Sequence, residues 1–115
     1  MAVSALASGT QTAVIGTEHF LAAAASPGTF TFHVDTNQLA SGDTLELRVY
    51  QTVLSGGTPR VAYMQSYSGA QPADDTVKTS VPASNELSVA NALRFSLKQT
   101  AGSGRSFPWK VLTYG

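Results

Sequence analysis

The sequence contains no cysteine. Disulfide bonds, cysteine-based zinc sites and a thiol nucleophile are therefore excluded. Charged residues are also scarce, since they make up 12% of the 115 residues and the seven acids balance the seven bases. The usual charged fraction is roughly 25%. Because nucleic-acid binding depends on clustered Lys and Arg, the composition favours a protein without a nucleic-acid partner.

Long apolar runs are missing as well. The most apolar stretch, Phe20–Ala25, is far shorter than the roughly 20 apolar residues of a membrane-spanning helix. The start of the chain, Met1–Leu6, has neither a basic segment nor a long apolar run. We therefore expect no secretory signal and no membrane partner.

The polar surface is supplied instead by thirteen Ser and thirteen Thr. These side chains suit the exposed faces of strands and cost less to desolvate than Lys or Glu. A surface with so little charge tends toward association unless a partner covers it. The composition therefore favours an assembled protein over a free monomer, and the length favours one domain.

The longest strand-like pattern, residues 42–69, predicts a central β-hairpin. Apolar and polar residues alternate from Thr44 toward Ser55, with the period of a half-buried strand, and Arg60–Ser68 runs back. Between them, Gly56-Gly57 supplies residues that reach positive φ in a tight turn.

The loop length of this hairpin decides its register. A two-residue loop places Leu47 opposite Ser66, whereas a three-residue loop, residues 56–58, places Leu47 opposite Tyr67. Cross-strand apolar pairs contribute roughly 0.2–1 kcal/mol each, and serine offers little of that. We therefore favour the three-residue loop.

Short strand patterns cover most of the remaining chain, and no segment predicts a helix longer than one turn. Further strands are expected at residues 11–15, 18–24, 28–35, 76–81, 86–90, 93–99 and 105–114. Residues 1–10 have few large apolar side chains, so we expect an extended N-terminal arm that lies against another chain. Pro108 cannot donate to a strand ladder, which indicates an edge position or a bulge.

Eight or nine short strands with turns at intervals of about ten residues indicate an all-β fold, an antiparallel β-sandwich. A jelly-roll-like form is favoured over the immunoglobulin-like alternative, because the strand count exceeds seven and a Cys-Trp-Cys pattern is missing. We expect a single domain, residues 1–115, with an arm over about residues 1–10. The predicted core consists of Phe30, Phe32, Val34, Leu45, Leu47, Val49, Leu93, Phe95, Leu97, Phe107, Trp109 and Val111.

The chain offers few groups for catalysis or metal binding. Its only histidines, His19 and His33, lie in predicted strands, and neither a G-x-S-x-G nor an S-x-x-K motif occurs. Asp74-Asp75 lacks the remainder of a calcium loop. Gly102–Arg105 resembles an anion-holding loop, but no helix follows it, so a hairpin turn is favoured. We expect no enzyme activity, no catalytic or metal site and no cofactor.

Exposed aromatic side chains offer a different possibility, a platform on which sugar rings stack. Core packing explains the tryptophan and at least one tyrosine more simply. The candidates are Trp109, Tyr50, Tyr63, Tyr67 and Tyr114.

Three segments carry a resemblance that goes beyond composition. They are ALASGTQT at residues 5–12 with GTEH at 16–19, GDTLELRVY at 42–50, and LKQTAGSGRSFPWKVL at 97–112. Together they resemble a family of small tailed-phage head proteins and are similar to capsid decoration (cement) proteins. The resemblance implies a structural virion protein, most often a trimer, that binds the major capsid protein on the outer surface of the shell and stabilises it. It also implies synthesis in the cytoplasm of a host bacterium, and it brings no catalytic residue.

A second hypothesis comes from a different class, a carbohydrate-binding or tail-fibre-type recognition module on a jelly-roll scaffold. Low charge, abundant Ser and Thr and the N-terminal arm favour the capsid protein. Aromatic side chains gathered on one concave face would favour the recognition module.

Overall fold

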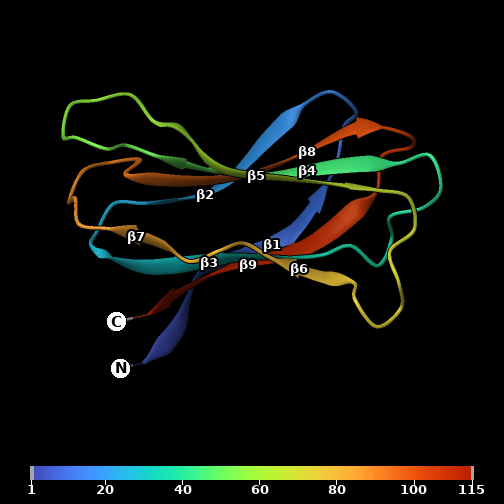
Figure 1. Ribbon diagram of the computed structural model, residues 1–115, viewed down its shortest axis with the longest axis horizontal. Coiled ribbons are helices and arrows are strands. Elements are labelled where there is room, and N and C mark those ends of the chain that lie inside the picture. The colour runs from blue at the N-terminus through green and yellow to red at the C-terminus, as the bar shows by residue number, and fades with distance from the viewer. Residues whose placement is uncertain (1, 115) are drawn as a thin grey trace.

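Nine β-strands form two antiparallel sheets that pack face to face in the computed structural model, which describes residues 2–114 (Figure 1). Within that range the chain forms no helix, and hence none long and apolar enough to cross a membrane. The strands are β1 (Val3–Thr12), β2 (Glu18–Ala24), β3 (Gly28–Asp35), β4 (Thr44–Gln51), β5 (Arg60–Ser68), β6 (Val77–Thr79), β7 (Ala83–Asn85), β8 (Leu93–Ala101) and β9 (Ser106–Tyr114).

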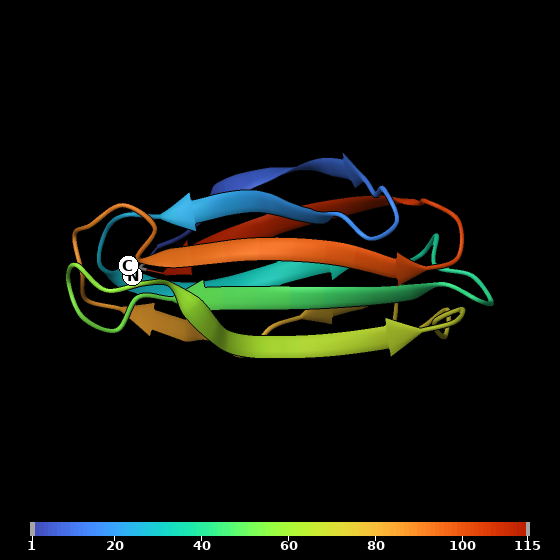
Figure 2. The same ribbon diagram turned by 90° about the horizontal axis from the view of Figure 1, so that it is seen from above.

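The chain passes from one sheet to the other at most of its connections. Sheet I has the order β1-β9-β3-β6, with β7 also paired to β3, and sheet II has the order β2-β8-β4-β5 (Figure 2). Only the β4–β5 and β6–β7 connections stay within one sheet. The prediction of an all-β antiparallel sandwich is confirmed, and this two-sheet architecture is common to the jelly-roll-like and immunoglobulin-like forms.

The core lies between the sheets, where alternate residues of each central strand point inward. Phe95 of sheet II contacts two rings of sheet I, with ring centroids 6.4 Å from Phe30 and 5.8 Å from Phe32. Eleven of the twelve predicted core residues are buried, and Trp109 is the exception. The strand period was therefore sufficient to find the core residues of the central strands, but it missed Ala13, Ala24 and Leu39.

Trp109 packs against the core but stays partly exposed. It lies opposite Gly9 of the outermost strand β1, and a Cβ added at Gly9 would lie 3.5 Å from the indole ring. The indole therefore reaches the margin of the sandwich, where solvent meets one side of it.

We expect Trp109→Ala to lower the free energy of unfolding by about 2 kcal/mol, less than the roughly 3–5 kcal/mol typical of fully buried aromatic residues. Because Trp109 is the only tryptophan, the unfolding curve should be followed by circular dichroism. A loss as large as that of Phe95→Ala would show that the indole is part of the core after all.

The N-terminal segment is a strand, so the prediction of an arm over residues 1–10 with a first strand at 11–15 is wrong for the described residues. β1 (Val3–Thr12) pairs with β9 of the same chain along its length. Residue 1 lies outside the described residues. Backbone hydrogen bonds along β9 supply the contacts that these small side chains do not, and apolar periodicity cannot detect them.

The predicted register of the central hairpin is also wrong. β4 ends at Gln51 and β5 begins at Arg60, so the loop spans residues 52–59, and Leu45 instead of Leu47 lies opposite Tyr67. Thr52 explains the difference, because its amide and hydroxyl groups donate to the carbonyls of residues 92 and 91, at 2.9 and 3.0 Å. Because Thr52 bonds to residues 91 and 92 and not to β5, the pairing of β4 with β5 ends at Gln51.

Two further strand predictions need correction. Residues 86–90 are not a strand, and the pairing segment is β7 (Ala83–Asn85), while residues 76–81 shorten to β6 (Val77–Thr79). Pro108 is not on an edge strand, because β9 lies between β1 and β3. It is tolerated there because the β3 ladder begins one residue later, at Trp109, so Pro108 has a paired neighbour on one side only.

Candidate functional site

The outer face of sheet II, which points away from sheet I, holds five of the fourteen charged side chains of the protein beside exposed apolar ones. Residues directly opposite each other on neighbouring strands share a face, so the register defines this surface. Its three cross-strand rows are Glu18–Lys98–Glu46–Ser66, Phe20–Ser96–Arg48–Met64 and Ala23–Arg94–Tyr50–Val61. We call it the sheet II outer face.

A network of hydrogen bonds at the centre of this face holds Glu18 and Arg48 in place. One carboxylate oxygen of Glu18 accepts bonds from the hydroxyl of Tyr50, at 2.7 Å, and the hydroxyl of Ser96, at 2.6 Å. The guanidinium of Arg48 lies 3.5 Å from Glu18 and 2.8 Å from Glu46. The network joins three strands, β2, β4 and β8, through their side chains.

The environment of Glu18 favours its ionised form. Burial by itself would raise the pKa of the Glu18 carboxyl, but the hydrogen bonds from Ser96 and Tyr50 and the charges of Arg48 and Lys98 outweigh it. The pKa therefore lies below its ordinary value. Glu18 is a structural anion, not a proton donor near neutral pH.

Apolar side chains stand exposed around this network. The guanidinium of Arg94 lies 3.8 Å above the ring of Phe20, whose centroid is 5.6 Å from that of Tyr50. Phe20 is 45% exposed, Val61 49% and Met64 51%. Aromatic residues, Met and Arg are the types enriched where proteins bind one another, and this face gathers them on a rigid sheet.

The outer face of sheet I is polar and carries few charges. The hydroxyl of Thr31 lies 2.8 Å from His33 and 3.1 Å from the hydroxyl of Tyr114, and Lys110 lies opposite His33 on β9. Burial lowers the pKa of His33, and the charge of Lys110 lowers it further. A shallow hollow of about 450 Å³ runs over this face from His33 to Trp109.

The residues that the sequence suggested for catalysis or metal binding do not lie together in the structure. His19 accepts a bond from the amide of Val14 in the β1–β2 turn, whereas His33 lies in the other sheet. Asp75 pairs with Lys78 at 3.1 Å, which accounts for one of the two carboxylates considered for calcium. Among residues 2–114, no group of three or more His, Asp or Glu side chains is arranged to hold a metal ion.

The five aromatic candidates for a sugar-stacking platform do not share one surface. Tyr50 lies on the sheet II outer face and Tyr114 on the outer face of sheet I. Tyr63, Tyr67 and Trp109 pack against the core. The platform considered from the sequence is therefore not assembled.

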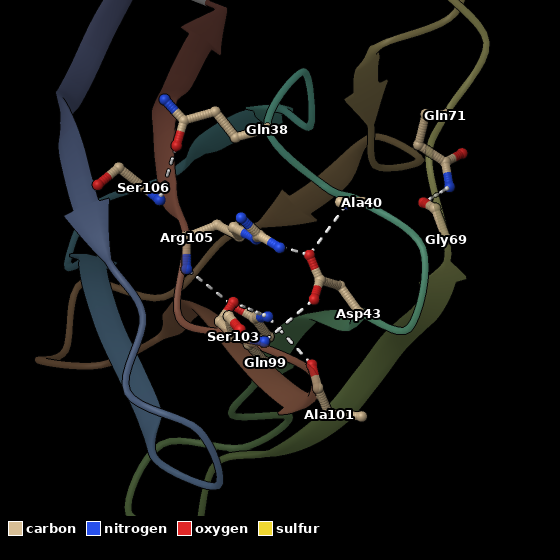
Figure 3. A network of polar contacts seen from close by, with 10 residues as sticks. All are labelled: Gln38, Ala40, Asp43, Gly69, Gln71, Gln99, Ala101, Ser103, Arg105 and Ser106. Carbon is tan, nitrogen blue, oxygen red and sulfur yellow. Dashed lines mark hydrogen bonds and ion pairs between the residues drawn. The ribbon is translucent and has the colours of Figure 1, made fainter.

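A buried carboxylate at one end of the sandwich is the polar site that the sequence did not reveal. Asp43, which is 1% exposed, accepts bonds from the amides of Ala40 and Ser103, at 2.9 and 3.1 Å, and from the guanidinium of Arg105, at 2.8 Å (Figure 3). The bonds tie the β3–β4 loop to the β8–β9 loop. Gly102–Arg105 thus does hold an anion, and the anion is a side chain of the same protein.

Gln99 and Gly102 complete this network. We call Asp43, its three donors and these two residues the Asp43 lock. Gln99, fully buried, donates to the carbonyls of Ala101 and Ser103, at 3.0 and 2.7 Å. Gly102 has a φ of +91°, and a Cβ at that position would overlap the Asp43 carboxylate. Burial tends to raise the pKa of Asp43, but the bonds from Ala40 and Arg105 hold it below its ordinary value.

Comparison of the chain with protein-family models, with curated protein sequences and with solved structures finds no match. The resemblance of the three segments to capsid decoration proteins therefore stays a prediction. The described residues form a face of exposed apolar side chains and ion pairs on sheet II and the Asp43 lock at one end.

Proposed function

We propose that the protein is a structural virion protein, a capsid decoration (cement) protein of a tailed phage. In this proposal it binds the outer surface of the shell formed by the major capsid protein and stabilises that shell, after synthesis in the host cytoplasm. The choice of this family rests on the three segments that resemble it, at residues 5–12 with 16–19, 42–50 and 97–112. The alternation of the chain between the two sheets supports the jelly-roll-like form of the sandwich.

The observation that carries the proposal is the sheet II outer face. Phe20 and Met64 project from strands at its opposite margins and are about half exposed. Such anchors can enter pockets of a partner without reordering the sheet.

The ion pairs of this face lower the cost of covering it. A charge that loses water on docking is costly unless it is already paired. Glu18 accepts two hydroxyl bonds and faces Arg48, and Arg48 also contacts Glu46. A capsid surface that covers Phe20 and Met64 therefore leaves these three side chains with their partners in place.

We expect Phe20→Ala and Met64→Ala each to weaken binding to undecorated shells at least tenfold, because a truncated anchor residue costs about 2 kcal/mol or more of binding free energy. The proposal implies a major capsid protein gene beside this one. Shells should be assembled from its product, and binding should be measured by co-sedimentation. Val77→Ala is the matched control, because Val77 is 55% exposed and lies on the outer face of sheet I.

Three outcomes would overturn the proposal. The intact protein could fail to bind the shells, Phe20→Ala could bind as tightly as the parent, or Val77→Ala could weaken binding to the same extent. The first would reject the function, and the other two would reject the face. The recognition-module hypothesis gains no support, because the aromatic side chains do not meet on one surface.

A further inference from the structure

β1 has a free edge. It is the outermost strand of sheet I and pairs only with β9, so along its ten residues one side of the backbone faces no other strand of the described chain (Figure 2). Unpaired N–H and C=O groups on such an edge form a template for another strand. The length of the edge makes it a candidate for pairing between molecules.

Proteins commonly protect edge strands with charged residues, proline or a bulge. β1 has neither charge nor proline, and its register with β9 is irregular only between Ala5 and Ala7. Its sequence, VSALASGTQT, contains no Asp, Glu, Lys, Arg or Pro. Of the other edge strands, β2 contains Glu18, β5 contains Arg60 and β6 contains Lys78, whereas β7 carries no charge but spans only three residues. β1 is therefore the longest edge that the sequence leaves without charge or proline.

The side chains of β1 also permit close approach. Most are small, and the strand overhangs the core, so nearly all of its residues are exposed. The two larger apolar ones, Val3 and Leu6, are 55% and 38% exposed. A neighbouring strand would cover apolar surface that the chain itself leaves in water.

We infer that β1 pairs antiparallel with β1 of a second copy of this chain, which joins two copies of sheet I into one continuous sheet. A strand paired with itself makes an isologous contact, and such a contact closes as a two-fold dimer. This inference replaces the trimer expected from the resemblance. It is independent of the proposed function, because the edge of sheet I lies apart from the sheet II outer face.

A second copy meets little charge repulsion at this edge, and the other edges of the chain are poorer partners for β1. Lys110 on β9 is the nearest cation, and pairing of the two β1 strands would hold the two copies of Lys110 three strand spacings apart, about 14 Å. That separation exceeds the Debye length of about 8 Å at physiological ionic strength. The β5 edge is a poorer partner, because it carries the charge of Arg60.

Cysteine scanning tests the contact directly, because the chain contains no cysteine of its own. We would prepare single-cysteine variants at each position from Val3 to Thr12, with Ser66→Cys on the β5 edge as the matched control. Strands that pair bring opposed Cα atoms within disulfide range. We expect mild oxidation to give covalent dimers at one β1 position, with its neighbours weaker, and none at Ser66.

A charged edge tests the same contact without oxidation. Thr10→Lys puts a lysine on the edge strand of both copies, and lysine is a residue with which proteins block pairing at sheet edges, so we expect the dissociation constant in analytical ultracentrifugation to rise at least tenfold, with an unchanged circular dichroism spectrum. Ser66→Lys on β5 should leave the dimer intact. A parent protein that sediments as a monomer or a trimer, a scan without any cross-linked β1 position, or equal effects of the two lysine variants would each overturn the inference.

Discussion

Replacing Phe95 with alanine is expected to lower the free energy of unfolding by about 3–5 kcal/mol, the range measured when large aromatic residues are truncated in cores. Phe95 is fully buried, and it contacts Phe30 and Phe32 across the space between the sheets. The substitution thus removes the ring that packs β8 of sheet II against β3 of sheet I. Chemical denaturation followed by circular dichroism measures the loss.

Phe20→Ala is the matched control, because Phe20 is also a phenylalanine of sheet II but points to solvent. Its removal should cost no more than about 1 kcal/mol, from the lost contacts with Arg94 and Tyr50. If the two variants unfolded at the same denaturant concentration, the assignment of inner and outer faces in sheet II would be wrong.

The second large effect concerns the Asp43 lock. Asp43→Asn is expected to lower the free energy of unfolding at pH 7 by about 3 kcal/mol, because hydrogen bonds to a charged group contribute about 1.5–3 kcal/mol each. Three donors converge on the two carboxylate oxygens, and an amide presents only one oxygen. Asp74→Asn, at an exposed position in the β5–β6 loop, should change the stability little.

The effect of Asp43→Asn should depend on pH. Because the folded protein lowers the pKa of Asp43, its contribution is fully present above the ordinary carboxyl pKa of about 3.9 and is lost as the pH falls through the lower folded value. Asparagine does not titrate. The difference in stability between parent and variant should therefore narrow below about pH 4, and a constant difference from pH 7 to pH 3 would contradict the assignment.

Gly102 gives an independent test of the same lock. Its positive φ and the nearness of the Asp43 carboxylate both oppose a side chain at that position. We expect Gly102→Ala to destabilise the protein at least as much as Asp43→Asn, and the two effects should not add, since both open the same contact. Additive losses would show that the two residues act separately.

The candidate site was only partly predictable. The sequence offered Gly102–Arg105 as an anion-holding loop, with a hairpin turn favoured, and Asp43 fell just before the strand predicted from Thr44, but these segments are about sixty residues apart in the chain. Only the adjacency of the β3–β4 and β8–β9 loops brings the carboxylate to Arg105. Likewise, the alternation of β4 placed Glu46 and Arg48 outward, yet the register with β2 and β8 was needed to bring Glu18 to them.

The three segments that resemble capsid decoration proteins meet at the end of the sandwich that holds the lock. The amide of Gly16 donates to the carbonyl of Gln99 at 2.9 Å, and the Asp43 carboxylate binds Arg105. These segments therefore contain residues that specify the fold. The shell-binding experiment is needed for this reason, because residues that build a fold do not by themselves name its partner.

The sequence by itself determined the all-β class, the inward-facing residues of the central strands and the scarcity of charge. These properties follow from local alternation and composition, which each residue carries wherever the chain folds. Tertiary structure decided the role of residues 3–12, the hairpin register and the partner of Asp43. Backbone hydrogen bonds and contacts between distant loops fix these features. Such contacts do not produce a periodic pattern of apolar residues in the sequence.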